Sequence, residues 1–369
     1  MRWISPMHPS ERLPERPDGR PSGDHAVDLA KFFMAILVVA LHVPPFHFVS
    51  PALDHALTYG LTRIAVPYFF VATAYYLFRK MVAGTIDRAV LGRYVRRIAR
   101  VYLLWSLIYL PLIAVQIVQD PAGIGHGLWS ALHHAIVIHT YPHLWFLYAL
   151  LLAVPLLAFL LARGLRLCTV FWCAVASYAI AVMGSSEPAL YHAYAPQHVQ
   201  DIFAALRQIF LSCGNPLTVA PVFLLIGASL AWHPPQIGTR RLVVLLAAAA
   251  VLFAAEAAWA IPRGLPDAEL GYYASLVPLL YLLFELTRRI RLPESGIYLH
   301  LRRLSMFLYC IHPWWIWILA GSGILPGVTL ARYETPAAFA AVIALSITSG
   351  ILVMRLSARP RFRFLKALF

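Results

Sequence analysis

The stretch VDLAKFFMAILVVALHV, residues 27–43, indicates the fold class of the chain. Its apolar run is broken only by Asp28, Lys31 and His42. With its neighbours it forms an apolar segment over residues 27–45, and an α-helix of about 20 such residues crosses the hydrocarbon core of a bilayer. The stretch therefore predicts a membrane-spanning helix that carries three ionisable groups.

Further apolar segments of similar length recur to the end of the chain. The composition agrees, since 61% of the residues are hydrophobic and 12% are charged, whereas soluble domains carry about 25% charged residues. We therefore predict an all-α fold, a polytopic membrane bundle of about ten transmembrane helices. The further segments are residues 60–79, 98–118, 144–163, 167–184, 215–232, 241–260, 271–288, 303–321 and 337–355.

The basic residues follow a pattern that orients this bundle. With these spans, all of the 30 Lys and Arg residues except Arg63, Arg207, Arg263 and Arg332 fall on one side. The positive-inside rule then predicts that both termini are cytoplasmic. The net charge of +14 indicates contact with anionic lipid. It does not indicate nucleic-acid binding, because no separate basic domain carries aromatic RNA-type motifs.

The ends of the chain differ from the apolar part. Residues 1–25 are polar and rich in Pro and Arg, and they predict a disordered cytoplasmic tail without a cleavable signal peptide. Residues 26–356 form the predicted transmembrane domain, and residues 357–369 a basic cytoplasmic tail. The four cysteines have no metal-like spacing and do not predict a disulfide framework.

Asp28, Lys31 and His42 form one polar stripe on the first predicted span. Asp28 and Lys31 are three residues apart, and Lys31 and His42 are close to three turns apart. At about 1.5 Å per residue, His42 lies roughly 16 Å above Lys31, towards the outer half of the membrane. A neutral imidazole there can act as a general base. Interface anchoring by Asp28 and Lys31, with His42 bonded to a neighbouring helix, remains the alternative.

A basic helix start, RYVRRIARVYLLWSLIY, covers residues 93–109. Arg93, Arg97 and Arg100 recur at spacings of four and three, so they share a helix face. Guanidinium groups clamp phosphates through paired hydrogen bonds. The pattern suits a phosphorylated cofactor on the cytoplasmic side, although contact with lipid headgroups would use the same residues.

Two more ionisable residues interrupt predicted spans. His312 precedes Pro313 in FLYCIHPWWIWI, and Glu256 stands alone in VLFAAEAAWA. Each predicts either a polar pocket or a hydrogen bond between helices. The histidines of residues 126–143 do not predict a metal site, because Pro142 interrupts the helix and no Cys or carboxylate cluster supports them. We expect no metal cofactor.

The apolar segments also carry short polar motifs in a set order. Between about residues 25 and 356 this order resembles the membrane-bound acyltransferase 3 family. The segments are DLAKFFMAILVVALH, VPYFFVATAYYLFRK, RRIARVYLLWSLIY, HLWFLYALLL, PVFLLIGASL and LSMFLYCIHP. Two positions depart from the family pattern: Lys31 stands where an Arg is usual, and Thr73-Ala74 where Ser-Gly is common.

The resemblance implies an enzyme of about ten spans that takes an acyl group, usually acetyl, from cytoplasmic coenzyme A. It implies that His42 is the catalytic histidine and that Arg97 and Arg100 hold the acyl-CoA; we expect Arg93 to assist. We expect Asp28 and Lys31 to shape the lower part of a channel beside the first span.

The expected function is O-acetylation in the bacterial inner (cytoplasmic) membrane, from acetyl-CoA to a hydroxyl of an envelope or secreted carbohydrate. Glu256, His143, Trp145 and His312 are expected in the acceptor pocket, with the Trp145 ring as a stacking face for a sugar. The branch that the chain looks closest to also includes the membrane domain of vancomycin-resistance serine racemases, which is linked to serine uptake. Transport of a small solute such as serine therefore remains the alternative.

Overall fold

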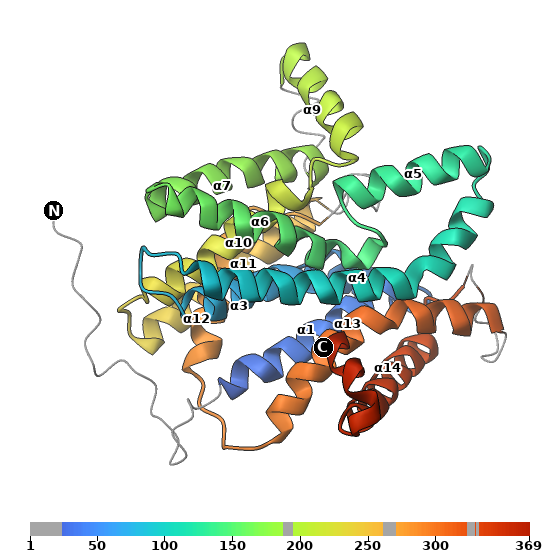
Figure 1. Ribbon diagram of the computed structural model, residues 1–369. Helices are drawn as coiled ribbons and strands as arrows, with labels where there is room; N and C mark the ends of the chain where they lie inside the picture. Colours follow the sequence, from blue (N-terminus) through green and yellow to red (C-terminus); the bar gives the residue numbers. More distant parts are fainter. Residues whose placement is uncertain (1–23, 187–194, 261–270, 323–328, 330–331) are drawn as a thin grey trace.

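The computed structural model describes residues 24–186, 195–260, 271–322, 329 and 332–369, and this part of the chain is helical without strands (Figure 1). In chain order its elements are α1 (His25–His42), α2 (Pro51–His55), η2 (Ala56–Gly60), η3 (Leu61–Ile64), α3 (Ala65–Phe78), α4 (Arg88–Val118), α5 (Ile124–Val137), η4 (Pro142–Leu144), α6 (Trp145–Ala162), α7 (Leu167–Ala181), η5 (Val182–Ser186), α9 (Gln197–Phe210), α10 (Pro216–Trp232), α11 (Thr239–Ala260), α12 (Leu276–Arg289), α13 (Ile297–Ser322), α14 (Pro336–Ser357) and η8 (Pro360–Leu368).

Eight helical stretches in the described part are long and apolar enough to cross a membrane. The predicted all-α membrane bundle is confirmed. Two predicted segments, 215–232 and 271–288, form the shorter helices α10, of 17 residues, and α12, of 14 residues. The eight long stretches are His25–His42, Pro51–Phe78, Arg88–Val118, Ile124–Ala162, Leu167–Gly184, Thr239–Trp259, Ile297–Gly321 and Pro336–Ser357.

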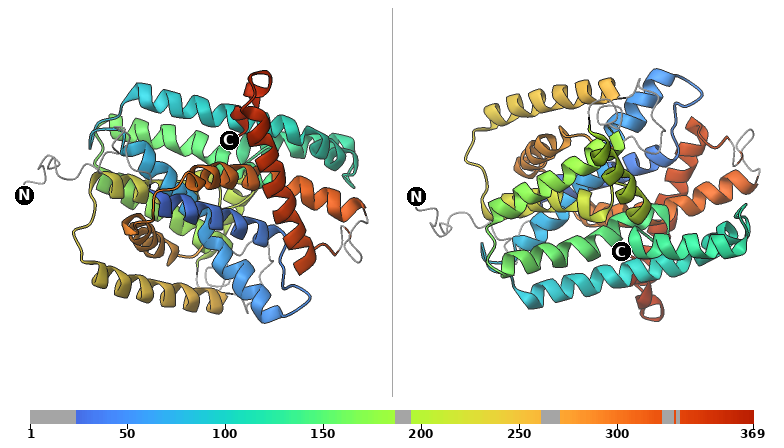
Figure 2. Two further views of the ribbon diagram at one scale, coloured as in Figure 1. Left: turned by 90° about the horizontal axis from the view of Figure 1, so that it is seen from below. Right: turned by 90° about the horizontal axis from the view of Figure 1, so that it is seen from above.

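Helix α10 lies at the centre of the bundle and packs against α3, α6, α7 and α12 (Figure 2). Its contact with α3 is close because Gly227 has no side chain: a Cβ there would lie 2.3 Å from the Val71 carbonyl oxygen and 2.8 Å from the Ala74 Cβ. Small residues let two helix backbones approach in a membrane, where apolar side chains gain nothing by leaving lipid. The small residue at position 74 thus serves helix packing.

Helices α1 and α13 pack along each other, and α1 also contacts α3, η2 and η3. Helix α13 carries Pro313 in its interior. Proline has no amide hydrogen to donate, so one carbonyl of the preceding turn is released from the helix ladder. Here the imidazole of His312 takes up the released carbonyl of Tyr309. The pairing of α1 with α13 places His42 and His312 side by side.

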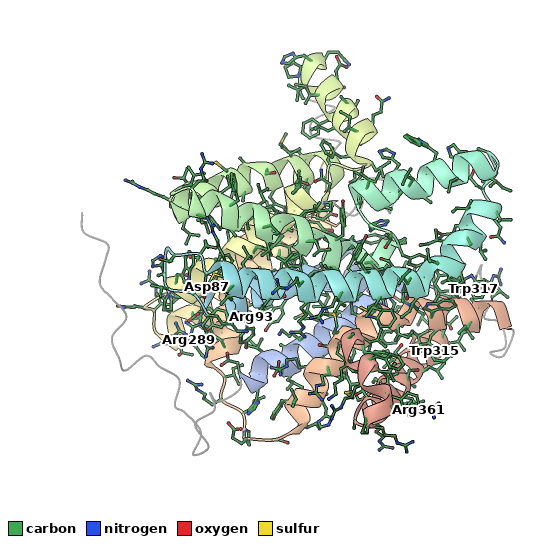
Figure 3. All side chains as sticks on the ribbon, in the orientation of Figure 1. Asp87, Arg93, Arg289, Trp315, Trp317 and Arg361 are labelled. Carbon is green, nitrogen blue, oxygen red and sulfur yellow. The ribbon has the colours of Figure 1, made fainter. Side chains whose placement is uncertain are left out.

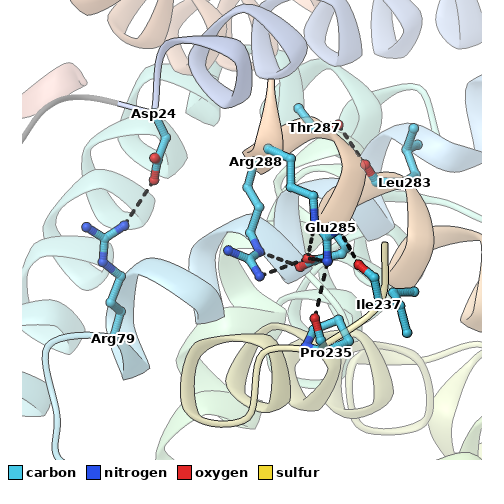
Figure 4. A network of polar contacts seen from close by, with 9 residues as sticks. Asp24, Arg79, Pro235, Ile237, Leu283, Glu285, Thr287 and Arg288 are labelled. Carbon is cyan, nitrogen blue, oxygen red and sulfur yellow. Dashed lines mark hydrogen bonds and ion pairs between the residues drawn. The ribbon is translucent and has the colours of Figure 1, made fainter. Parts of the chain in front are cut away.

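An ion cluster closes the end of α12 (Figure 4). The Glu285 carboxylate, 0% exposed, accepts from Arg288 Nη2 at 2.9 Å, from Arg288 Nε, and from Arg289 Nε at 2.6 Å. Arg289 also donates to the Ile237 carbonyl at 2.7 Å and the Pro235 carbonyl at 3.2 Å. The cluster therefore fastens α12 to the connection between α10 and α11.

The predicted basic tail folds onto the bundle. Its helix η8 packs against α14 and α4. The Trp105 indole Nε1 donates to the Leu368 carbonyl at 3.3 Å, and the rings of Phe307 and Phe369 lie 6.0 Å apart. These contacts place residues 360–369 beside the middle of α4.

Candidate functional site

The structure brings together three histidines that are far apart in the sequence. The ring centroids of His42 and His312 lie 5.2 Å apart, and those of His143 and His312 lie 5.5 Å apart. His42 comes from α1, His143 from η4 and His312 from α13. Their proximity results from the packing of α1 on α13 and of η4 on α13. Three of the predicted site residues therefore form one cluster, which we call the histidine cluster.

His312 is held by the turn that precedes Pro313. Its Nδ1 lies 2.9 Å from the Tyr309 carbonyl oxygen and 3.2 Å from the Leu308 carbonyl oxygen. Tyr309 is the residue whose carbonyl the amide of Pro313 cannot reach. Because a carbonyl only accepts, Nδ1 carries the hydrogen and Nε2 has a free lone pair. Nε2 is buried, without a hydrogen-bond partner in the described residues.

His143 has the opposite arrangement. Its Nε2 donates to the Cys310 carbonyl at 3.2 Å, so its Nδ1 has the free lone pair. That Nδ1 atom is likewise buried and has no partner within the described ranges. Buried polar atoms are nearly always paired, by protein, water or ligand. The cluster thus presents two unused acceptors that suit the hydroxyl groups of a bound molecule.

His42, Lys31 and Arg63 share one kind of environment. Each of the three side chains keeps an intermediate exposed fraction. His42 is therefore not sealed in the close-packed core.

The lower end of α1 carries a second group of charges. Arg302 Nη1 lies 4.0 Å from Asp28 Oδ2, and Lys31 Nζ lies 4.9 Å from the centroid of the Tyr76 ring. The charges of Asp28, Arg302 and Arg97 all act on Lys31. Lys31 and Arg302 thus lie near the Asp28 carboxylate, and Arg97 of α4 acts on Lys31. We call Lys31, Arg97 and Arg302 the lower cation group; Arg302 had no predicted role beyond orientation.

The predicted phosphate-binding arginines separate in the structure. All three are exposed. Arg97 Nη2 donates to the Phe369 carbonyl at 3.4 Å, whereas Arg100 Nε donates to the Arg96 carbonyl of its own helix at 3.4 Å. Figure 3 places Arg93 near the end of the bundle that also carries Arg289. Of the three, Arg97 is the one that lies with Lys31.

Helix α4 is longer than a membrane span requires. It has 31 residues, which at 1.5 Å per residue gives a length of about 46 Å against about 30 Å of hydrocarbon. Its basic first turns can therefore lie outside the hydrocarbon while its apolar remainder crosses it. This is the position in which arginines meet either lipid headgroups or a phosphorylated cofactor.

Glu256 and Trp145 lie in structural contacts. The Glu256 carboxylate accepts from the Ala274 amide at 2.7 Å, the Ser275 amide at 2.8 Å and the Ser275 hydroxyl, and so holds the start of α12. The Trp145 ring packs edge-on against Phe70 at 5.7 Å. For Glu256 this is the contact between helices that the sequence left open. Their part in an acceptor pocket remains a prediction.

Arg63 is the site residue that sequence reasoning missed. It was counted only as one of four basic residues on the predicted outer side. The structure places it in the stretch Pro51–Phe78, in helix η3, which contacts the helix α1 that ends at His42. The available signal was a charge inside an apolar segment, which is costly and marks functional positions in membrane proteins. Among the described residues, no group of three His, Cys, Asp or Glu side chains is arranged to hold a metal ion.

Comparison with known proteins gives a family and distant relatives. A family model described as an acyltransferase domain matches residues 24–355. A serine/alanine racemase of Enterococcus gallinarum is 25% identical over 79% of this chain and 40% of the racemase. An amino-acid racemase of Enterococcus faecalis is 29% identical over 40% of this chain and 21% of that protein. The chain thus aligns with less than half the length of these relatives. No solved structure matches.

Proposed function

Because this chain belongs to the acyltransferase family whose model covers residues 24–355, we propose that it is a membrane O-acetyltransferase. In this proposal it moves an acetyl group from cytoplasmic acetyl-CoA to a hydroxyl of an envelope or secreted carbohydrate, in the inner membrane of a bacterium. The observation that carries the proposal is His42, an imidazole that stays partly exposed and forms a cluster with His143 and His312, each of which has a buried ring nitrogen with an unused lone pair.

The donor would enter from the predicted cytoplasmic end. The lower cation group supplies three positive charges for the phosphates of coenzyme A, and the exposed Arg93 and Arg100 lie on the same basic helix start. Guanidinium and ammonium groups both bind phosphate, the former through paired hydrogen bonds. The pantetheine arm would then run beside α1 from Lys31 towards His42. Asp28 offsets part of the charge and keeps Lys31 and Arg302 in place.

The chemical step follows from the position of His42. Its unprotonated nitrogen takes the proton of the acceptor hydroxyl as the oxygen attacks the thioester carbonyl. The bond between carbon and sulfur then breaks, and the departing sulfur takes the proton back from the imidazolium. The products are the acetyl ester and free coenzyme A. His143 Nδ1 and His312 Nε2 would accept hydrogen bonds from further acceptor hydroxyls and orient them.

The test is acetyl transfer by the purified protein. Release of the coenzyme A thiol and incorporation of labelled acetyl into a carbohydrate are measured for the wild type, for His42→Ala and for His126→Ala. His126 is an exposed histidine paired with Asp120 outside the bundle core, so its variant is the matched control. General base removal should slow transfer roughly 100- to 10,000-fold in His42→Ala alone. Equal rates in the two variants would remove His42 from the mechanism.

A second candidate function is favoured by the relatives. Both are named as racemases of amino acids, one of serine and alanine. Under this alternative the internal space beside α1 would carry a small solute such as serine through the membrane. Uptake of labelled serine into vesicles without acetyl-CoA, together with no acetyl transfer, would favour it over the enzyme.

A further inference from the structure

Arg63 lies in a helical stretch of unusual geometry. The π-helix η2 is followed directly by the 3₁₀-helix η3, which contains Arg63. Helix α3 begins directly after η3. Regular α-helix resumes only at Ala65. Short π and 3₁₀ turns within a helical stretch occur often at functional positions, because they redirect side chains. Here they turn a cationic side chain towards the interior of the bundle.

The donors of this guanidinium are mostly unused. Arg63 Nε donates to the Thr58 carbonyl at 3.0 Å, and the guanidinium carbon lies 5.6 Å from the centroid of the Tyr59 ring. A guanidinium has five N–H donors, so four remain. Throughout the part of the chain that the structure describes, no carboxylate forms an ion pair with Arg63. Its positive charge therefore has no carboxylate partner among the described residues.

The described groups that surround Arg63 are neutral. Its Nη1 lies against Gly271, where a Cβ would come within 2.5 Å of it. Tyr272 donates its hydroxyl to the Gly214 carbonyl at 3.1 Å, and Tyr273 donates to the Tyr59 carbonyl at 2.6 Å. Backbone and phenol oxygens stabilise a guanidinium less than a carboxylate does. An unpaired charge inside a membrane bundle is expensive, and a bound anion would offset it.

We propose that Arg63 binds the carboxylate of the acceptor, so that the acceptor is a hydroxyl compound that also carries an acid group. Helix η3, which carries Arg63, contacts α1, the helix that ends at His42, and the histidine cluster offers two acceptors for hydroxyl groups. A molecule held by its carboxylate at Arg63 therefore presents a hydroxyl to His42. The role of that hydroxyl rests on the proposed acetyl transfer, whereas binding of the carboxylate does not.

Two small molecules share this chemistry. An acidic sugar carries a carboxylate and several hydroxyls, and so fits a carbohydrate acceptor. A hydroxy amino acid carries a carboxylate and one hydroxyl. Each has a neutral counterpart of similar size: D-glucose for D-glucuronate, and serinol for L-serine. Comparing each acid with its counterpart isolates the contribution of the carboxylate.

The experiment measures binding by the full chain in detergent, without acetyl-CoA, by titration calorimetry. The variants are Arg63→Gln, Arg63→Lys and Arg332→Gln. Arg63→Gln removes the charge, whereas Arg63→Lys keeps the charge but loses the paired N–H donors of the guanidinium. Arg332 is an exposed arginine on the same predicted outer side, so its variant is the matched control. In the wild type at least one acid should bind about tenfold or more tightly than its neutral counterpart. Arg63→Gln should abolish this preference, Arg63→Lys should reduce it, and Arg332→Gln should keep it.

The proposal is overturned if neither acid is preferred in the wild type, if the preference survives in Arg63→Gln, or if Arg332→Gln loses it equally. The wild-type comparison decides the matter even if Arg63→Gln does not fold. A preference for glucuronate identifies an acidic sugar as the source of the carboxylate, and a preference for serine identifies an amino acid.

The two proposals can fail separately. Acetyl transfer to glucose that is as fast as transfer to glucuronate, with Arg63→Gln unchanged, leaves the transferase intact and removes the carboxylate site. Arg63-dependent binding of an acid in a protein that releases no thiol from acetyl-CoA does the reverse.

Discussion

The cluster at Glu285 and the surroundings of Arg63 are two ways of placing charge inside an apolar bundle. Glu285 is wholly buried, and Arg288 and Arg289 satisfy its carboxylate while Arg289 also binds two backbone carbonyls. Arg63 has one backbone acceptor, an aromatic ring and no ion pair in the described part of the protein. The Glu285 cluster joins α12 to the connection between α10 and α11. Arg63 makes no such link, and its unused N–H donors are left for a ligand.

The largest loss of stability should come from removing the charge of Glu285. Glu285→Gln leaves two arginines without their anion, and breaking a buried pair in this way costs about 3–5 kcal/mol. We expect about 3 kcal/mol, the lower end of that range, because both arginines are partly exposed. Equilibrium unfolding in mixed detergent micelles measures the loss.

The control is Glu294→Gln, whose carboxylate is 59% exposed and pairs with His25. An exposed pair contributes about 1 kcal/mol or less. If both variants lost the same small amount, Glu285 would not be a structural fastening.

A smaller loss should follow from Glu256→Ala. The change leaves two amides and one hydroxyl at the start of α12 without an acceptor, and we expect a loss of about 2 kcal/mol. Glu256→Gln keeps one acceptor oxygen and should recover part of it. The same unfolding measurement applies, with acetyl transfer measured in parallel. Normal stability with lost transfer would instead place Glu256 in the acceptor pocket.

Arg63→Met tests the other side of the comparison. Replacing an uncompensated buried charge by an apolar side chain is often neutral or stabilising. We expect the ligand-free protein to unfold at the same free energy or up to about 1 kcal/mol higher. A loss comparable to that of Glu285→Gln would show that Arg63 is a structural residue and would remove the contrast.

The lower cation group lies between the two extremes. Asp28 lies 4.0 Å from Arg302, whose side chain is 54% exposed. Because water screens an exposed charge, Arg302→Gln should change stability by less than about 1 kcal/mol and weaken coenzyme A binding only about threefold to fivefold. Calorimetric titration with coenzyme A measures this, with Arg303→Gln as the neighbouring control. Equal effects of the two variants would indicate general attraction to the basic end rather than a site.

The sequence predicted the helical bundle well because apolar runs report directly on membrane spans. It was less informative for α12. The described helix starts at Leu276 rather than at residue 271, because the residues just before it form a turn whose amides donate to the Glu256 carboxylate. Local sequence cannot reveal such a partner 18 residues away.

The candidate site was predicted residue by residue but not as an assembly. His42 and His312 stood out as polar breaks in apolar runs, yet only the packing of α1 on α13 brings their rings to 5.2 Å. Arg63 was assigned to the predicted outer side because charge counting treats every arginine alike. Its irregular helix, and the absence of a carboxylate partner among the described residues, are properties of the fold that no pattern in the sequence reveals.

The proline next to His312 has a consequence beyond the shape of its helix. By withholding an amide from Tyr309, Pro313 leaves a carbonyl for which the imidazole is the nearby hydrogen donor. An ordinary residue at position 313 would supply a competing amide, and the ring would keep only its longer contact with the Leu308 carbonyl. Pro313 thus favours one tautomer of the His312 ring, and so it determines which of the two ring nitrogens is basic.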